Sequence, residues 1–310
     1  MIDKLEMFIA VATEGHFGRA AESLGISQPT LSSGIKQLED QLGVRLIRRG
    51  SRYGGLTAEG EVALVRARQI VADTRSLREE MRHSREGLKG RMKIAVIPTA
   101  LTCAADLVTR FSERHPEVTF TILSRTSDEI LRMLDNLEID AGLSYLDNEP
   151  LGRTRTERLY RESYMLVCAQ GSDLGTRDKV GWADLDGRDL GLLTTDMQNR
   201  RIIDRNLREA GAAPLVSVES SSLIVLAAKA ARGGCMTVLP REVAAFLAAG
   251  NGLATVPIEG GQPGHLVGIV APRAEPHPPM IRALLDETRR MALEETTPGL
   301  PKVRRAHPVS

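Results

Sequence analysis

The sequence predicts an α/β protein with a helix-rich N-terminal domain, a long connecting helix and a C-terminal domain of alternating strands and helices. Three observations support this fold class. Residues 1–58 place apolar side chains at helical spacing between glycine turns, and residues 58–84 contain no proline that would end a helix. From Arg91 onward, short apolar runs alternate with amphipathic segments, which predicts a parallel sheet covered by helices.

The composition is that of a folded protein with room for two domains. The chain has 310 residues, of which 42% are hydrophobic and 26% charged, and these values exclude extended disorder. No apolar run approaches the roughly 18 residues that span a bilayer. Acidic residues occur among the first six, where a secretion signal needs basic and apolar ones. We therefore expect a cytoplasmic protein with no membrane partner.

The first 26 residues predict two helices and a turn. Leu5, Phe8 and their neighbours recur at helical spacing, so residues 3–14 form an amphipathic helix. A second, short helix covers residues 19–24, and residues 25–26 make the turn that follows it.

The third helix completes a helix-turn-helix. Ser27 is its N-cap, and Pro29 fits the first turn, where a missing N–H costs nothing. Leu31, Ile35, Leu38 and Leu42 form its buried stripe. The opposite face bears no carboxylate and can enter a major groove; it consists of Gln28, Pro29, Ser32, Ser33 and Lys36.

A basic segment without acidic residues follows this helix between Gln41 and Ala58. Residues 44–48 predict a strand, residues 54–57 its return and residues 50–53 the tip between them. An arginine-rich hairpin directly after a helix-turn-helix is typical of a wing, which binds phosphate while the helix reads bases. The residues that we expect to contact DNA are Arg19, Ser27, Gln28, Pro29, Thr30, Ser32, Ser33, Lys36, Arg48, Arg49 and Arg52.

The long helix begins after Thr57, which can cap it. Its apolar and small residues alternate steps of four and three, the spacing of a helix pair. This seam predicts dimerisation, the alternative being a stripe that packs on its own domain. The seam residues are Ala63, Ala67, Ile70, Thr74, Leu77, Met81, Ser84 and Leu88.

The C-terminal region predicts two sets of strands and helices. The first set has strands at 92–97, 119–123 and 139–145 and helices at 104–114 and 129–137. The second has strands at 164–169, 190–194, 215–218 and 236–239 and helices at 202–210 and 223–231. The strand at 266–271 and the helix at 280–291 can return to the first set.

Three stretches of the sequence resemble one family of regulators. Residues 17–32, continued by 35–43, are similar to the helix-turn-helix of the LysR-type transcriptional regulators nearly word for word. Residues 56–60 are similar to the end of that family's wing, and residues 231–240 to a late motif of its effector domain. The resemblance extends from about Ile2 to about Leu293.

The resemblance implies an N-terminal winged helix-turn-helix, a long linker helix that dimerises, and a C-terminal effector domain of two subdomains resembling type 2 periplasmic binding proteins. It implies a homodimer or homotetramer that binds double-stranded promoter DNA, with RNA polymerase as a further partner to consider. A small-molecule effector binds in the cleft between the subdomains. We assign residues 1–58 to DNA binding, 59–89 to the linker helix, 90–295 to effector binding (subdomain I at about 91–160 and 265–295, subdomain II at about 161–264) and 296–310 to a flexible tail.

The sequence departs from the family pattern at three positions. Ser33 and Gly34 stand where the family commonly has arginine and a longer polar residue, so DNA contacts at that helix position are weaker and Lys36 and the wing contribute more. Gly34 also costs the helix about 0.5–1 kcal/mol relative to alanine. Gly18 stands where serine or threonine usually caps the second helix, and glycine is acceptable there.

The cleft is predicted from the loops at the carboxyl ends of strands. Ligands of open α/β sheets bind there, next to helix N-termini that favour anions. We expect a small carboxylate or a similar anion as effector. The alternative is that each serine or threonine only caps its own helix. The effector-binding candidates are Thr99, Ala100, Thr102, Ser127, Met197, Gln198 and Ser221.

Two other functions remain open at this point. The first is a thiol-based redox-sensing regulator of the same family, which needs two neighbouring cysteines, whereas Cys103, Cys168 and Cys235 are far apart in sequence. The second is an enzyme or a solute-binding protein. The sequence has no Gly-rich phosphate loop, nucleophile elbow or His-Glu-x-x-His motif. We therefore expect no enzymatic activity, catalytic residue, cofactor or metal.

Overall fold

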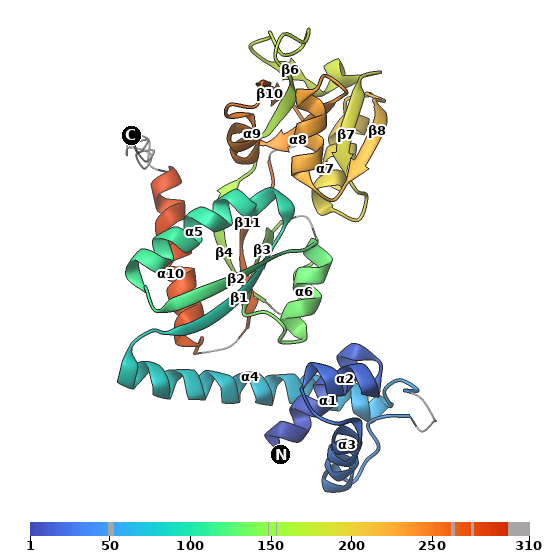
Figure 1. The fold of residues 1–310 in the computed structure, drawn as a ribbon, viewed down its shortest axis with the longest axis vertical. Helices are drawn as coiled ribbons and strands as arrows, with labels where there is room; N and C mark the ends of the chain where they lie inside the picture. The colour runs from blue at the N-terminus through green and yellow to red at the C-terminus, as the bar shows by residue number, and fades with distance from the viewer. Residues whose placement is uncertain (49–52, 148, 153, 262–263, 274–275, 297–310) are drawn as a thin grey trace. The chain divides into compact units, whose positions relative to one another are not determined.

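The fold was analysed in a computed structural model that describes residues 1–48, 53–147, 149–152, 154–261, 264–273 and 276–296 (Figure 1). The chain divides into two compact units. The first contains residues 1–88 with 132–139 and 274–279, and the second contains residues 89–131, 140–273 and 280–310. None of the helices in the described ranges is both long enough and apolar enough to cross a membrane.

The first unit contains the helices α1 (Ile2–Glu14), α2 (Phe17–Ser23), α3 (Gln28–Leu42) and α4 (Ala58–Glu86). Phe8 of α1 is fully buried against Leu31 and Leu38 of α3, as the apolar spacing predicts. Gly15 ends α1 in the left-handed conformation, at a φ of 59° that side chains disfavour. Ser27 caps α3, because its hydroxyl accepts the N–H of Thr30.

The cap of α2 differs from the expectation. The helix begins at Phe17, and His16 caps it by accepting the N–H of Gly18 at 3.0 Å on Nδ1. Gly18 is therefore inside the first turn rather than at the N-cap. A histidine ring nitrogen can supply the acceptor that serine or threonine usually provides.

The predicted wing strands at 44–48 and 54–57 do not form regular strands. The described residues of this segment are joined by a single antiparallel bridge, between Ile47 and Leu56. The cause lies in α3, where the carboxylate of Glu39 accepts the backbone N–H groups of Leu46 and Ile47. The N–H of Leu46 is therefore not available to extend the pairing beyond the bridge, which is flanked by hydrogen bonds from Arg48 to Gly55 and from Thr57 to Leu46. The expected tip lies mostly outside the described residues, which exclude 49–52.

The predicted seam of α4 divides into two parts. Ala67 is 1% exposed because it packs with Leu64 and Val71 in the core of the first unit, as the alternative interpretation required. Ile70, Leu77 and Met81 are exposed, each with about half of its surface accessible. One stripe of the helix therefore packs on its own domain, and a second apolar stripe faces outward.

The second unit contains two mixed sheets. In the first, the order is β2-β1-β3-β11-β4, with β1 parallel to β2 and β3, and β11 antiparallel to β3 and β4. Its strands are β1 (Gly90–Val96), β2 (Val118–Ser124), β3 (Ala141–Tyr145), β4 (Thr154–Arg161) and β11 (Leu266–Pro272). Its helices are η1 (Pro98–Ala100), α5 (Leu101–Arg114), α6 (Ser127–Asp135) and α10 (Pro279–Thr296). The chain returns to this sheet through β11, as the sequence allowed.

The second sheet has the order β6-β10-β5-β9-β7-β8. Its strands are β5 (Tyr164–Ala169), β6 (Val180–Gly181), β7 (Asp189–Leu193), β8 (Leu215–Ser220), β9 (Met236–Pro240) and β10 (Leu253–Glu259). Its helices are η2 (Trp182–Leu185), α7 (Gln198–Glu209), α8 (Leu223–Ala231) and α9 (Arg241–Ala248). The parallel arrangement predicted for the first set of strands is confirmed, since β1 pairs in parallel with β2 and β3, whereas β5 of the second sheet is antiparallel to β9 and β10.

Candidate DNA interface and ligand cavity

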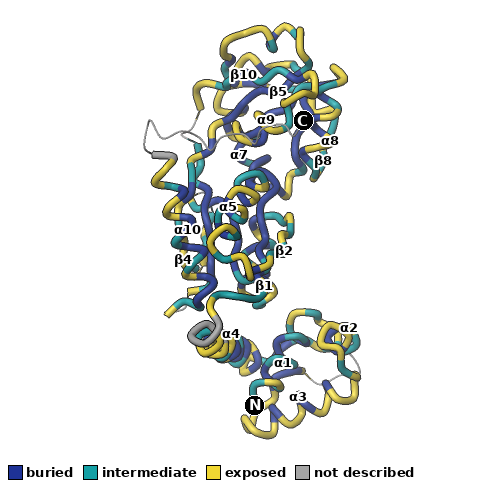
Figure 2. The backbone as a smooth tube through the Cα atoms, turned by 60° about the vertical axis from the view of Figure 1, so that its left-hand side comes forward, coloured by how far each residue is buried: buried dark blue, intermediate teal, exposed yellow. Residues whose placement is uncertain are grey.

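The exposed face of α3 contains the residues that the sequence assigns to base contacts, and Figure 2 colours much of the backbone of α3 as exposed. Ser27, Gln28, Pro29, Thr30, Ser32, Ser33 and Lys36 are all exposed. Ser27 and Thr30 also have a local role, since their hydroxyls lie 2.8 Å apart at the helix N-terminus. The opposite face of α3 is buried from Leu31 to Leu38, which leaves this polar face available for a groove; Leu42, predicted to continue the buried stripe, is instead exposed at the end of the helix.

The basic side chains beside this face differ in how they are held. Arg19 is 61% exposed, and its guanidinium donates to the carbonyl oxygen of Glu14 at the end of α1. Arg48 is exposed next to the bridge. Arg49 and Arg52 lie outside the described residues.

Gly34 does not belong to the groove-facing side of α3. It is buried, and a Cβ at this position would overlap the thioether sulfur of Met7 in α1. The glycine therefore permits close packing of α1 on α3. The expectation that Gly34 replaces a DNA-contacting side chain is wrong for this reason.

A small cavity lies in the second unit, where three helices begin. Its volume is about 10 Å³, close to the space that one water molecule needs. The described lining residues are Ile97, Pro98, Thr99, Thr126, Ser127, Tyr145, Leu193, Met197, Gln198 and Asn199. They come from η1 before α5, the start of α6, the start of α7 and the ends of β3 and β7.

Two polar side chains at the cavity are buried without a partner. The hydroxyl oxygen of Ser127 and the amide nitrogen of Gln198 have no hydrogen bond in the described part of the chain, and each residue is at most 5% exposed. Ser127 is not the cap of α6, because Thr126 and Glu129 form a reciprocal capping pair there. An unpaired buried polar group is costly, so these groups are suited to a bound ligand or water.

The sequence-predicted cleft residues are only partly brought together. Thr99, Ser127, Met197 and Gln198 line the cavity. Ala100 is buried, Thr102 is the second residue of α5 and Ser221 is exposed, and the lining residues do not include these three.

Sequence reasoning missed a buried polar cluster behind the cavity. The hydroxyl groups of Tyr145 and Tyr164 donate to one carboxylate oxygen of Glu162, at 2.8 and 3.0 Å. The amide of Asn199 donates to the hydroxyl oxygen of Tyr145 at 3.1 Å, and the hydroxyl of Thr99 lies 3.4 Å from the same atom. The signal in the sequence is weak, because an isolated glutamate between two strands is typical of an exposed turn.

Burial has a large effect on this cluster. Desolvation raises the pKa of Glu162 from its usual value to about 7, although Tyr145, Tyr164 and Thr99 act in the opposite direction by hydrogen bonding. The pKa values of Tyr145 and Tyr164 are raised well above their usual values, first by burial and then by nearby groups that include the carboxyl of Glu162. Both phenols therefore remain neutral donors.

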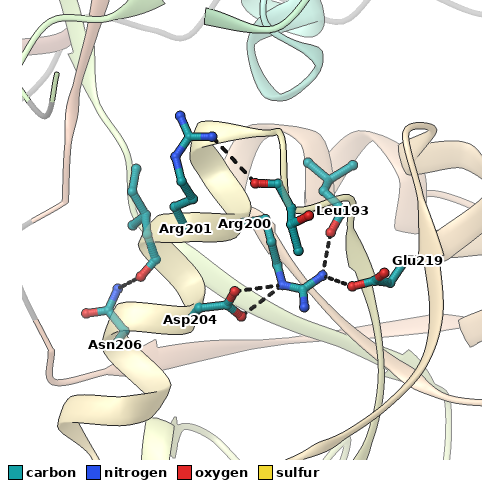
Figure 3. A network of polar contacts seen from close by, with 8 residues as sticks. Leu193, Arg200, Arg201, Asp204, Asn206 and Glu219 are labelled. Atoms are coloured by element: carbon teal, nitrogen blue, oxygen red, sulfur yellow. Dashed lines mark hydrogen bonds and ion pairs between the residues drawn. The ribbon is translucent and has the colours of Figure 1, made fainter. Parts of the chain in front are cut away.

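The start of α7 is held by Arg200 (Figure 3). Its guanidinium donates to the carboxylates of Asp204 and Glu219 and to the carbonyl oxygen of Leu193, at 2.5 to 2.8 Å. These bonds join the first turn of α7 to β7 and β8. Gln198 and Asn199, which precede Arg200, are thereby fixed at the cavity.

Comparison with known families identifies both parts of the chain. Residues 2–61 match the family described as bacterial regulatory helix-turn-helix protein, lysR family, and residues 85–292 match the LysR substrate binding domain. The chain belongs to the LysR family. The fold class and the regulatory function predicted from the sequence are thereby confirmed, and the chain is a LysR-type DNA-binding transcriptional regulator.

Individual relatives agree with this result. The chain is 27% identical over 240 residues to the HTH-type transcriptional regulator YfeR of Shigella flexneri. The matched region makes up 77% of this chain and 78% of YfeR. It is 28% identical over 270 residues to OxyR of Escherichia coli, covering 87% and 88% of the two chains. A full-length OxyR variant of Pseudomonas aeruginosa has a similar structure, with a TM-score of 0.74, 26% identity and coverage of 97% and 99%.

The thiols of this LysR-family protein are mostly buried. Burial raises the pKa of the Cys168 thiol, and it raises that of Cys235 despite the opposing charge of Lys229. Cys103 is half-buried in α5. Raised thiol pKa values disfavour the thiolate, which is the reactive form.

Proposed function

We propose that this LysR-family protein binds promoter DNA through α3 and the adjoining basic segment, and that a small anion in the cavity of the second unit regulates it. The observation that supports the ligand proposal is the pair of buried, unpaired groups at the cavity, Ser127 and Gln198. Both lie in the first turn of a helix, where N–H groups and the helix dipole favour negative charge. The alternative, that these groups only cap helices, does not account for them.

The size of the cavity indicates how binding acts on the protein. A space of about 10 Å³ holds a water molecule but not a carboxylate. Binding must therefore move Thr99 and Ser127, which follow strands of the first sheet, away from Gln198, which follows a strand of the second. A ligand that favours this more open state shifts the population of the two states and thereby changes DNA binding.

The assembly and the domain limits form part of the same proposal. The exposed stripe of Ile70, Leu77 and Met81 supports pairing of two α4 helices in a homodimer, and two dimers form a tetramer. We assign residues 1–58 to DNA binding, 59–89 to the linker helix and 90–295 to effector binding. Contact with RNA polymerase at the promoter is part of the proposed regulation.

The ligand proposal is tested by thermal denaturation of the full-length protein with acetate, lactate, succinate, benzoate and sulfate. We expect at least one anion to raise the melting temperature, and we expect S127A and Q198A to abolish the rise. S221A removes an exposed hydroxyl that does not line the cavity, so it should behave as the unmodified protein. A rise that persists in both cavity variants would place the anion elsewhere.

The thiol-based alternative requires a reactive cysteine pair. None of the observations above favours it, since Cys168 and Cys235 are buried with raised pKa values. Regulation by a bound ligand rather than by oxidation, and without an enzymatic reaction, is therefore our proposal.

A further inference from the structure

Glu162 is a buried acid that has no role in the function proposed for the cavity. It lies between β4 and β5 and is 3% exposed. One of its carboxylate oxygens, Oε2, accepts both tyrosine hydroxyl groups. The other, Oε1, has no hydrogen-bond partner among the described residues. A carboxylate with one unpaired oxygen in the protein interior is energetically unfavourable, and protonation of that oxygen relieves the cost.

Tyr145 connects this acid to the ligand cavity. Tyr145 lines the cavity, its hydroxyl donates to Glu162, and the same oxygen accepts the amide of Asn199. Thr99, which also lines the cavity, lies 3.4 Å from that oxygen. A ligand that takes the hydrogen bond of Thr99 or Asn199 therefore changes the group that donates to Glu162.

The charge balance of the cavity is unusual for an anion site. Its described lining residues include no lysine, arginine or histidine, so a bound anion would have only hydroxyl, amide and N–H donors. A second negative charge on Glu162 in the same buried region would repel it. Two carboxylates that share a buried site do not both remain ionised, and one of them binds a proton.

The other charged and titratable groups around Glu162 do not neutralise it. Tyr145 of β3 and Tyr164 of β5 are neutral, and the charge of Asp147, beyond β3, disfavours ionisation of Glu162 further. Arg161 at the end of β4 and His265 before β11 both pair with Asp147, at 3.7 and 3.1 Å. The backbone N–H of Glu162 donates to the carbonyl oxygen of His265.

We propose that an anionic effector enters the cavity together with one proton, which Glu162 takes up on Oε1. The inference rests on the proposed function of the cavity and specifies its chemistry. The proton comes from solvent, one O–H bond forms, and Glu162 changes from −1 to neutral while the effector brings −1. The net charge of the site therefore does not change, and an effector response depends on pH as well as on concentration.

The expected pH dependence follows from linkage. Since the pKa of Glu162 in the free protein is about 7, a fully ionised anion should bind roughly tenfold more weakly at pH 8 than at pH 6. Below pH 6 the affinity should level off, because Glu162 is then already protonated. An anion site that depends on a lysine or arginine also binds more weakly as the pH rises, but its affinity changes only above about pH 9 and not between pH 6 and pH 8.

The first experiment measures anion affinity of the full-length protein at pH 6, 7 and 8, with the anion from the panel above that gives the largest thermal shift. E162Q keeps the shape of the side chain but cannot titrate, so its affinity should be the same at all three pH values. H265Q is the matched control, since it replaces the side chain that pairs with Asp147 and leaves Glu162 in place, and it should retain the tenfold change. Tenfold dependence in E162Q but not in H265Q would overturn the proposal.

A second measurement uses only the unmodified protein, so its result does not depend on whether E162Q folds. Calorimetric titration of the unmodified protein at pH 8, in two buffers of different ionisation enthalpy, should show uptake of about one proton for each anion bound. Binding that is abolished by S127A but takes up no proton would overturn the role of Glu162 and leave the proposed function intact. If none of the five anions binds at any of these pH values, the anion site itself is wrong, and this inference falls with it.

Discussion

Glu39 of α3 binds the backbone of Leu46, whose N–H donates to its Oε1 at 2.8 Å. The same oxygen accepts the N–H of Ile47, and Oε2 accepts the guanidinium of Arg45 at 2.7 Å. One carboxylate thus fixes the segment that follows α3. We expect E39A to destabilise the DNA-binding unit by about 2–3 kcal/mol, since it leaves two buried N–H groups unpaired. Chemical denaturation would measure the change, with the exposed D40A as control.

The same carboxylate makes stability depend on pH. Burial acts to raise the pKa of Glu39, but the N–H groups of Leu46 and Ile47 and the Arg45 guanidinium lower it overall, below its usual 4.5. Its contribution is therefore fully present above about pH 4.5 and is lost as the pH falls through the lowered value. The stability difference between the unmodified protein and E39A should narrow below pH 4. A constant difference down to pH 2 would contradict this account.

Gly60, in the first turn of α4, allows the long helix to approach the bridge. A Cβ on Gly60 would overlap the backbone carbonyl oxygen of Leu46, which cannot move away as a flexible side chain can. We expect G60A to lower stability by about 2 kcal/mol, although alanine is intrinsically the better helix residue by about 1 kcal/mol. G87A, with a φ of 78° and no nearby atoms, is a matched variant that tests backbone conformation without overlap. A stabilised G60A would show that α4 does not pack as described.

The sequence predicted those elements in which neighbouring residues all favour the same secondary structure. The helices α3 and α8 and the strand β5 have uniform apolar patterns, and the structure reproduces them closely. Sequence analysis missed β4, because its polar and charged residues form a strand only at the edge of a sheet. It also missed β10, because Pro257 interrupts that strand.

The candidate site was predictable only where it follows from strand ends. Thr99, Ser127 and Gln198 each follow a strand or begin a helix, and that local position was enough to single them out. Tyr145, Glu162 and Asn199 meet through tertiary packing of β3, the β4–β5 turn and α7. No local pattern connects residues that are so far apart in sequence.

The different roles expected of Gln28 in base contacts and of Arg48 in phosphate contacts give a further prediction. Gln28 is exposed on α3, and Arg48 is exposed beside the bridge. We propose that Arg48 contacts one phosphate, so R48A should weaken binding to all duplexes alike and reduce the slope of log K against log salt by about 1. Q28A should instead change the preference among sites by about 1–3 kcal/mol at one base pair. Fluorescence anisotropy with a panel of duplexes at several salt concentrations distinguishes the two. Identical profiles for both variants would refute this division.

Replacement of the three cysteines tests the thiol-based alternative. Because Cys168 and Cys235 are buried with raised pKa values, we expect the triple alanine variant of Cys103, Cys168 and Cys235 to bind DNA as the unmodified protein does. Hydrogen peroxide should not change the affinity of either protein. A peroxide response that the triple variant loses would establish redox sensing instead.

Arg200 provides a prediction about positioning rather than contact. It does not line the cavity, and its hydrogen bonds to Leu193 and Glu219 hold the start of α7, where Gln198 and Asn199 line the cavity. R200M keeps the length of the side chain but removes these bonds. Because Glu219 is about half exposed, solvent screens that pair, and we expect a loss of stability of about 1–2 kcal/mol.

The anion affinity of R200M should fall about tenfold or more, because the first turn of α7 is no longer fixed. R208M alters an exposed arginine on the same helix and should leave both properties unchanged. A saturating concentration of anion distinguishes loss of positioning from general destabilisation. Under that condition R200M should show the same thermal shift as the unmodified protein. Loss of stability with unchanged anion affinity would mean that Gln198 keeps its place without Arg200.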